Sequence, residues 1–79
     1  MKAWETEYGN HRIRIENHFS GEILIVDGKT IDQTTGYDER GKLVGMLPEG
    51  KLIVANIGQW FTIGCNLFVD GEEVQLSKV

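Results

Sequence analysis

The sequence predicts an all-β fold, a small antiparallel β-sandwich or barrel of about seven to eight strands built from hairpins. Apolar and polar residues alternate with a period of two along most of the chain, as in strands with one face in a core. Two Asp-Gly pairs, at residues 27–28 and 70–71, are typical of tight hairpin turns. No segment has the i, i+3, i+4, i+7 spacing of an amphipathic helix, so no long helix is expected.

The N-terminal residues predict the first hairpin. Residues 3–8 and 11–16 both alternate, and the Gly-Asn pair at residues 9–10 suits the turn between them because both residue types tolerate positive φ. The second of these strands directs Ile13 and Ile15 toward the core and its charged side chains toward water.

Each Asp-Gly pair also predicts the register of its hairpin. A turn at residues 27–28 makes Leu24 oppose Ile31 on one face of the sheet. A turn at residues 70–71 makes Leu67 oppose Val74 in the same way. The two turns imply three further pairs, Val26 with Lys29, Val69 with Glu72 and Cys65 with Leu76.

The two hairpin segments have similar sequences. L-I-V-D-G-K-T-I begins at residue 24, and L-F-V-D-G-E-E-V begins at residue 67. A chain of 79 residues has room for one core. We therefore expect a single all-β domain over residues 1–79, with a weak internal two-fold repeat.

The uncharged stretch at residues 52–69 is the centre of the expected core. Its odd positions are mostly apolar, which indicates a strand or two consecutive strands. A strand continuing from residue 57 to 69 would be about twice the usual length, so we expect a bend or bulge near Gly64 that lets it serve two sheets. Pro48 presets φ for a turn between strands at residues 43–47 and 52–57. Residues 32–42 are polar and predict a loop.

Composition limits the classes of partner. The formal net charge is -4, and the 8 Lys and Arg residues are scattered, which argues against nucleic acid and anionic membranes as partners. One cysteine cannot form an internal disulfide, and the polar N-terminal segment does not resemble a secretion signal. The expected location is the cytoplasm.

Catalytic and metal sites are not expected. Cys65 with His11 or His18 would make a nucleophile and base, but Cys65 falls on the apolar face, where a small buried hydrophobe is the ordinary role. The two histidines have opposite parity in an extended chain, which disfavours a shared zinc ion. The acidic residues at 27, 32, 38 and 39 lack the spacing of an EF-hand loop. We expect no enzyme activity and no cofactor.

Several short motifs follow one another in a known order. H-R-I-R-I-E begins at His11, a link ends in Ser20-Gly21, and strands end in V-D-G-K at residues 26–29 and V-D-G-E at residues 69–72. This order resembles the β-sandwich domain of the Fas apoptotic inhibitory molecule family. The resemblance implies a compact antiparallel sandwich without a catalytic centre, and it transfers no functional residue.

Exposed aromatic residues are the best candidates for function. Trp60 and Phe68 share the even face of the central stretch, and Tyr37 lies in the polar loop. We expect these three residues to form an interaction surface for a protein partner or for self-association. The alternative is a carbohydrate-binding domain that uses Tyr37 and Trp60. A core position is favoured for Trp4, whereas core and surface positions are equally compatible with Trp60.

Overall fold

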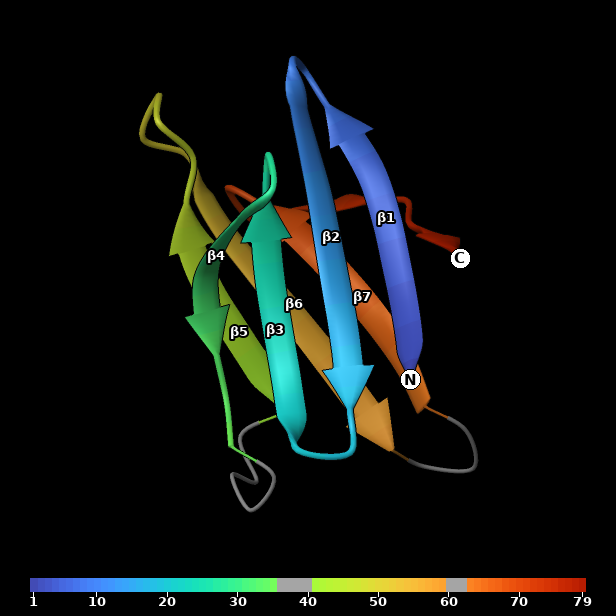
Figure 1. Cartoon of the computed structure of the whole chain (residues 1–79). Coiled ribbons are helices and arrows are strands. Elements are labelled where there is room, and N and C mark those ends of the chain that lie inside the picture. The colour runs from blue at the N-terminus through green and yellow to red at the C-terminus, as the bar shows by residue number, and fades with distance from the viewer. Residues whose placement is uncertain (36–40, 60–62) are drawn as a thin grey trace.

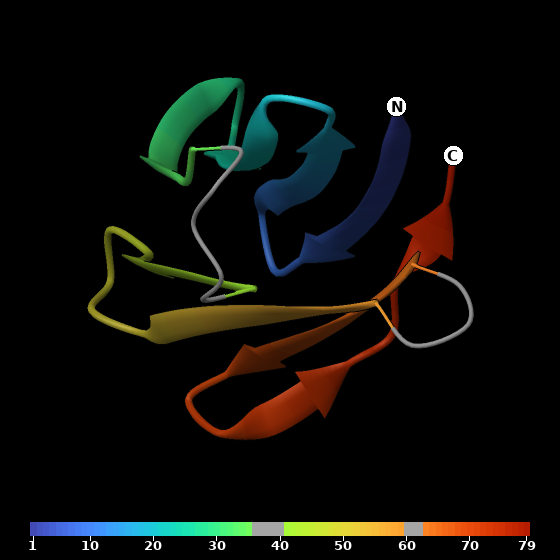
Figure 2. The same ribbon diagram turned by 90° about the horizontal axis from the view of Figure 1, so that it is seen from below.

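The computed structural model describes residues 1–35, 41–59 and 63–79. Within these residues the chain forms two antiparallel sheets, with strand orders β4-β3-β2-β1-β9 (sheet A) and β5-β6-β7-β8 (sheet B). Figure 2 shows the sheets as two layers, so the predicted antiparallel all-β fold is confirmed, and of the two expected forms it is the sandwich. The described residues form nine strands instead of the expected seven to eight. The strands, labelled in Figure 1 where space allows, are β1 (Lys2–Tyr8), β2 (His11–His18), β3 (Gly21–Val26), β4 (Lys29–Gln33), β5 (Lys42–Met46), β6 (Leu52–Gln59), β7 (Ile63–Val69), β8 (Glu72–Val74) and β9 (Ser77–Lys78).

The core lies between the two sheets and is built from the inward positions of their strands. Trp4 belongs to it with 6% of its surface exposed, as favoured from the sequence. Ile13 and Ile15 of β2 are fully buried, as predicted. The other large buried side chains are Leu24, Val26, Leu43, Leu47, Ile53, Ile57, Leu67 and Val69.

The register of the Asp-Gly hairpins is confirmed near the turns and differs farther from them. Val26 pairs with Lys29, and Val69 pairs with Glu72. The pairing of Leu67 with Val74 is also confirmed. The expected Leu24–Ile31 and Cys65–Leu76 pairs do not form.

The Leu24–Ile31 prediction is wrong because β4 contains a bulge. The register shifts between Leu24 and Ile25, so Leu24 pairs with Asp32. A bulge of this kind redirects the residues that follow it. Here Asp32 reaches β5, where its Oδ2 accepts a 2.8 Å hydrogen bond from the backbone N–H of Val44. The bulge therefore helps to join the edges of the two sheets.

The Cys65–Leu76 prediction is wrong because β8 ends at Val74. The chain then crosses to sheet A, where Ser77 pairs with Glu5 and Lys78 with Trp4. Leu76, between these two strands, packs against the core. This crossover produces β9, which the sequence did not predict.

The central stretch forms two antiparallel strands in the same sheet. Gly58 of β6 pairs directly with Gly64 of β7. The prediction of one long strand that bends near Gly64 and belongs to both sheets is therefore wrong. The alternative prediction, two consecutive strands, is correct. The odd positions face inward, as Ile57 and Leu67 show.

Both Asp-Gly turns are held by the same pair of hydrogen bonds. Asp27 donates its backbone N–H to the Arg12 carbonyl and accepts from the Arg12 N–H through Oδ1, both at 2.9 Å. Asp70 makes the equivalent bonds with Leu52, at 2.8 and 2.7 Å. Both aspartates have positive φ, near 50°. The two similar sequence strings thus form similarly anchored hairpins, one in each sheet.

Candidate interaction face and the polar end of the sandwich

Only one residue of the predicted interaction surface lies within the described residues. Phe68 is half-buried on the outer side of β7. Trp60 and Tyr37 lie outside the described residues, so their predicted roles are untested. Trp4 contributes to the core.

Phe68 belongs to a continuous apolar surface on the outer side of sheet B. Val44 pairs with Val54, and Val54 pairs with Phe68, so these side chains form one row across three strands. Met46 and Leu52 pair in the adjacent row. We call the surface formed by Val44, Met46, Leu52, Val54 and Phe68 the apolar face.

Three members of the apolar face expose large parts of their side chains to solvent. Met46 is 60% exposed, Leu52 is 42% exposed and Val44 is 39% exposed. By contrast, Phe19 is an exposed aromatic residue in the β2–β3 turn and is not part of the apolar face. Single exposed hydrophobic residues are ordinary, but a contiguous group on one sheet face marks an interaction surface.

Polar groups border the apolar face on two sides. The next row across the sheet is Lys42, Asn56 and Asn66. Glu73 of β8 pairs with Phe68 and accepts a 2.8 Å hydrogen bond from Asn66 Nδ2 through Oε2. An apolar centre with a polar rim is the usual arrangement of a protein–protein interface.

The outer side of sheet A has a different chemistry. Arg12 pairs with Glu5 and Glu7, at 2.9 and 3.0 Å. Arg14 donates to both Glu5 and Glu16. These ion pairs leave Arg14 and Glu16 less exposed than the sequence suggested. The charged groups of sheet A thus bind one another, whereas the exposed apolar groups of sheet B have no covering layer within the described residues.

The sequence contains a signal for the apolar face that the alternation of apolar and polar residues does not reveal. In residues 43–47 and 52–55 nearly every position is apolar or small, on both sides of the strand. Such runs are typical of strands covered on both faces. In this chain one side packs in the core, and the other side forms the apolar face.

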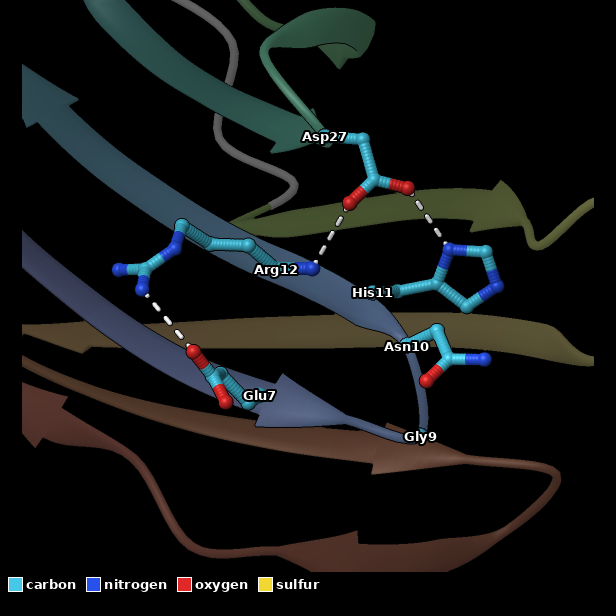
Figure 3. A pocket seen from close by; sticks show the side chains of 6 residues that line it. All are labelled: Glu7, Gly9, Asn10, His11, Arg12 and Asp27. Atoms are coloured by element: carbon cyan, nitrogen blue, oxygen red, sulfur yellow. Dashed lines mark hydrogen bonds and ion pairs between the residues drawn. The ribbon is translucent and has the colours of Figure 1, made fainter.

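The β1–β2 and β3–β4 turns lie at the same end of the sandwich (Figure 1), and a shallow polar hollow lies between them (Figure 3). Its volume is about 340 Å³, and its lining residues are Glu7, Gly9, Asn10, His11, Arg12 and Asp27. These residues include no Ser, Thr or Cys that would act as a nucleophile.

His11 links three turns of the two sheets at this end. Its Nδ1 lies 2.7 Å from Asp27 Oδ2, and its Nε2 lies 2.9 Å from Glu49 Oε1. When both carboxylates are ionised, both ring nitrogens must donate, which requires the protonated imidazolium. The hydrogen bond to Asp27, followed by that to Glu49, raises the pKa of His11. His11 thus acts as an ionic bridge between sheet A and the β5–β6 turn.

A buried polar group lies inside the sandwich near Cys65. Glu22 Oε1 accepts a 2.7 Å hydrogen bond from Thr34 Oγ1, which in turn accepts from the Glu22 N–H. Burial, together with the negative charge of Glu22, raises the pKa of Cys65 to about 12. Cys65 is partly buried against the core, and its thiol remains protonated at neutral pH.

The two histidines of β2 lie too far apart to bind one metal ion together. His11 and His18 lie at opposite ends of β2, about 23 Å apart for an extended strand, and cannot share an ion. Across residues 1–35, 41–59 and 63–79, no three His, Cys, Asp or Glu side chains are placed to hold a metal. Those same residues form no helix long and apolar enough to span a bilayer.

Comparisons with known proteins give no relative. No family model, no curated protein and no solved structure matches this chain. Its function is therefore inferred from its own residues and geometry.

Proposed function

We propose that this protein is a non-enzymatic interaction module that binds another protein surface through the apolar face. The observation that carries this proposal is the continuity of five apolar side chains across β5, β6 and β7, three of which are exposed. Covering such a surface removes apolar area from water, at about 25 cal/mol per Å². Its rim of Lys42, Asn56, Asn66 and Glu73 supplies groups for orientation.

The edges of sheet B are less suitable for binding than its face. The Val44 N–H of edge strand β5 already donates to Asp32. Edge strand β8 has three residues, and Glu72 and Glu73 give it two negative charges. Short, charged edge strands oppose the addition of another strand.

The chemistry of the apolar face favours a protein over a carbohydrate. Four of its members are aliphatic or Met, and Phe68 is the one aromatic residue. A sugar platform needs flat aromatic rings beside polar groups. The carbohydrate alternative depends on Tyr37 and Trp60, and a glycan array with tryptophan fluorescence titration would test it.

Site-specific photo-crosslinking tests the proposed function. A photoreactive phenylalanine analogue replaces Met46 in one variant and Thr30 in a matched control. Thr30 is exposed on edge strand β4 of the other sheet. On irradiation in cells of the source organism, we expect protein adducts of defined mass from position 46 and none from position 30. Equal crosslinking from both positions, or none from position 46, would contradict the proposal.

A further inference from the structure

The rim of the apolar face carries charges of opposite sign on opposite sides. Lys42, on β5, is exposed and points outward, because its neighbour Leu43 is buried in the core. Glu73, on β8, is exposed on the same face as Phe68. The outward positions between them are uncharged, namely Asn56 and Asn66 in the row of Lys42, and Val54 and Phe68 in the row of Glu73. The face is therefore positive at the β5 edge and negative at the β8 edge. Between these edges it carries only uncharged side chains, both apolar groups and the amides of Asn56 and Asn66.

This arrangement is complementary to a second copy of itself. A two-fold axis parallel to the strands, between β6 and β7, places β5 of each copy over β8 of the other, and β6 over β7. Val54 of one copy then faces Phe68 of the second copy, and the β5 strand that carries Lys42 faces the β8 strand that carries Glu73. Glu73 is in register with Phe68, one same-face row (about 7 Å) from the row of Lys42. The hydrogen bond from Asn66 Nδ2 holds its carboxylate toward the row of Lys42, where the long Lys42 side chain of the second copy can meet it.

We infer that the occupant of the apolar face is a second copy of this chain, in a symmetric face-to-face dimer with two Lys42–Glu73 ion pairs. This inference rests on the proposed function and names the partner of the same surface. The outer face of a four-stranded sheet with an eight-residue strand covers on the order of 400 Å². With both copies counted, a dimer would bury on the order of 800 Å², which is the size of a weak, transient interface and predicts micromolar or weaker affinity.

Sedimentation of the purified protein tests the dimer, at about 0.15 M salt and over a wide concentration range. We expect the mass to rise from that of a monomer, 8.9 kDa, to twice that value. Lys42→Glu and Glu73→Lys should each weaken dimerisation by about tenfold or more, because each puts like charges opposite each other twice in the dimer. The double variant Lys42→Glu/Glu73→Lys should restore it. Lys29→Glu, an exposed change of equal charge on β4, is the matched control and should have no effect.

The outcomes separate this inference from the proposed function. Circular dichroism and thermal melting confirm that each variant is folded before its mass is interpreted. A protein that stays monomeric at millimolar concentration, or a dimer that the charge reversals do not affect, overturns the second-copy inference. If the crosslinks from position 46 then contain a different protein, the proposed function stands. If position 46 gives no adduct, both are wrong.

Discussion

Gly21 shows how a single residue can be fixed by its surroundings. Its φ of +143° lies in a region that favours glycine, and a Cβ at this position would overlap the backbone carbonyl oxygen of Thr34. The Thr34 backbone cannot retreat easily, because its N–H donates to the Glu22 carbonyl at 2.9 Å. Both the strain and the overlap therefore oppose any side chain at residue 21.

We predict that Gly21→Ala lowers the free energy of unfolding by about 3 kcal/mol or more, since overpacking and backbone strain combine. Gly58→Ala is the matched control, because Gly58 also lies in a strand but has neither positive φ nor an atom within 4 Å of a new Cβ. Its effect should stay within about 1 kcal/mol. Urea denaturation of both variants measures the difference, and equal losses would contradict the role given to Thr34.

At the scale of the element, the aspartate of each Asp-Gly turn both adopts a positive φ and accepts a hydrogen bond from a neighbouring strand. Asp70 tolerates a φ of 49°, and its carboxylate accepts from the Leu52 N–H at the start of the preceding strand. The turn therefore connects three strands instead of two. The hairpin signal in the sequence predicted the turn, whereas the bond to a residue 18 positions away required the assembled sheet.

We predict that Asp70→Ala lowers the free energy of unfolding by about 1 to 2 kcal/mol. The change leaves the Leu52 N–H without its hydrogen-bond acceptor. It also places Ala at positive φ, where Asp is tolerated better because its side chain can form a local hydrogen bond. Asp70→Asn should cost less, because its amide oxygen can accept the same bond and Asn tolerates this φ. Thermal melts of the two variants provide the measurement. Asp70→Ala with wild-type stability would show that the carboxylate does not hold the turn.

At the scale of the whole molecule, His11 ties sheet A to the β5–β6 turn of sheet B. Its hydrogen bonds, first to Asp27 and then to Glu49, raise the pKa of His11 in the folded protein. The bond from His11 is the main cause that lowers the pKa of Asp27. For Glu49 the main cause of the lowered pKa is its own backbone N–H, and His11 adds to it.

These directions fix the pH dependence of the bridge. A histidine with a raised pKa stabilises the fold fully below its unfolded pKa, about 6.5, and this contribution is lost as pH rises through the folded value. The carboxylates of Asp27 and Glu49, whose pKa values are lowered in the folded protein, stabilise the fold above about pH 4 to 4.5. This stabilisation is lost as the pH falls through their folded pKa values. The bridge is therefore strongest between about pH 4.5 and 6.5.

We predict that the stability difference between the wild type and His11→Gln is largest near pH 5.5 and shrinks by pH 8. Gln can keep part of the hydrogen bonding but cannot carry the positive charge. Urea denaturation at several pH values measures the difference. Glu49→Gln should reduce the pH dependence in part, because Asp27 remains. A difference that is constant from pH 5 to 8 would show that protonation of His11 does not couple the sheets.

The sequence by itself determined the fold class, the position of most strands and the register beside the turns. Alternation with period two placed Ile13, Ile15 and Leu67 in the core, and Asp-Gly chemistry located two hairpins. These signals are local, because they depend on φ preferences and on the side-chain parity of a single strand. The resemblance to the Fas apoptotic inhibitory molecule family stays a prediction, as do the roles of Trp60 and Tyr37.

Only the tertiary structure decided which features meet across the sandwich. The β4 bulge, the crossover to β9 and the His11 bridge each join residues from different elements, so no local pattern encodes them. The apolar face is the same kind of feature. Residues 43–47 and 52–55 are apolar or small on both sides, but this pattern does not say whether another layer covers the second side. That depends on how many layers the chain can build, and 79 residues form two sheets with one shared core, which leaves the outer side of sheet B exposed.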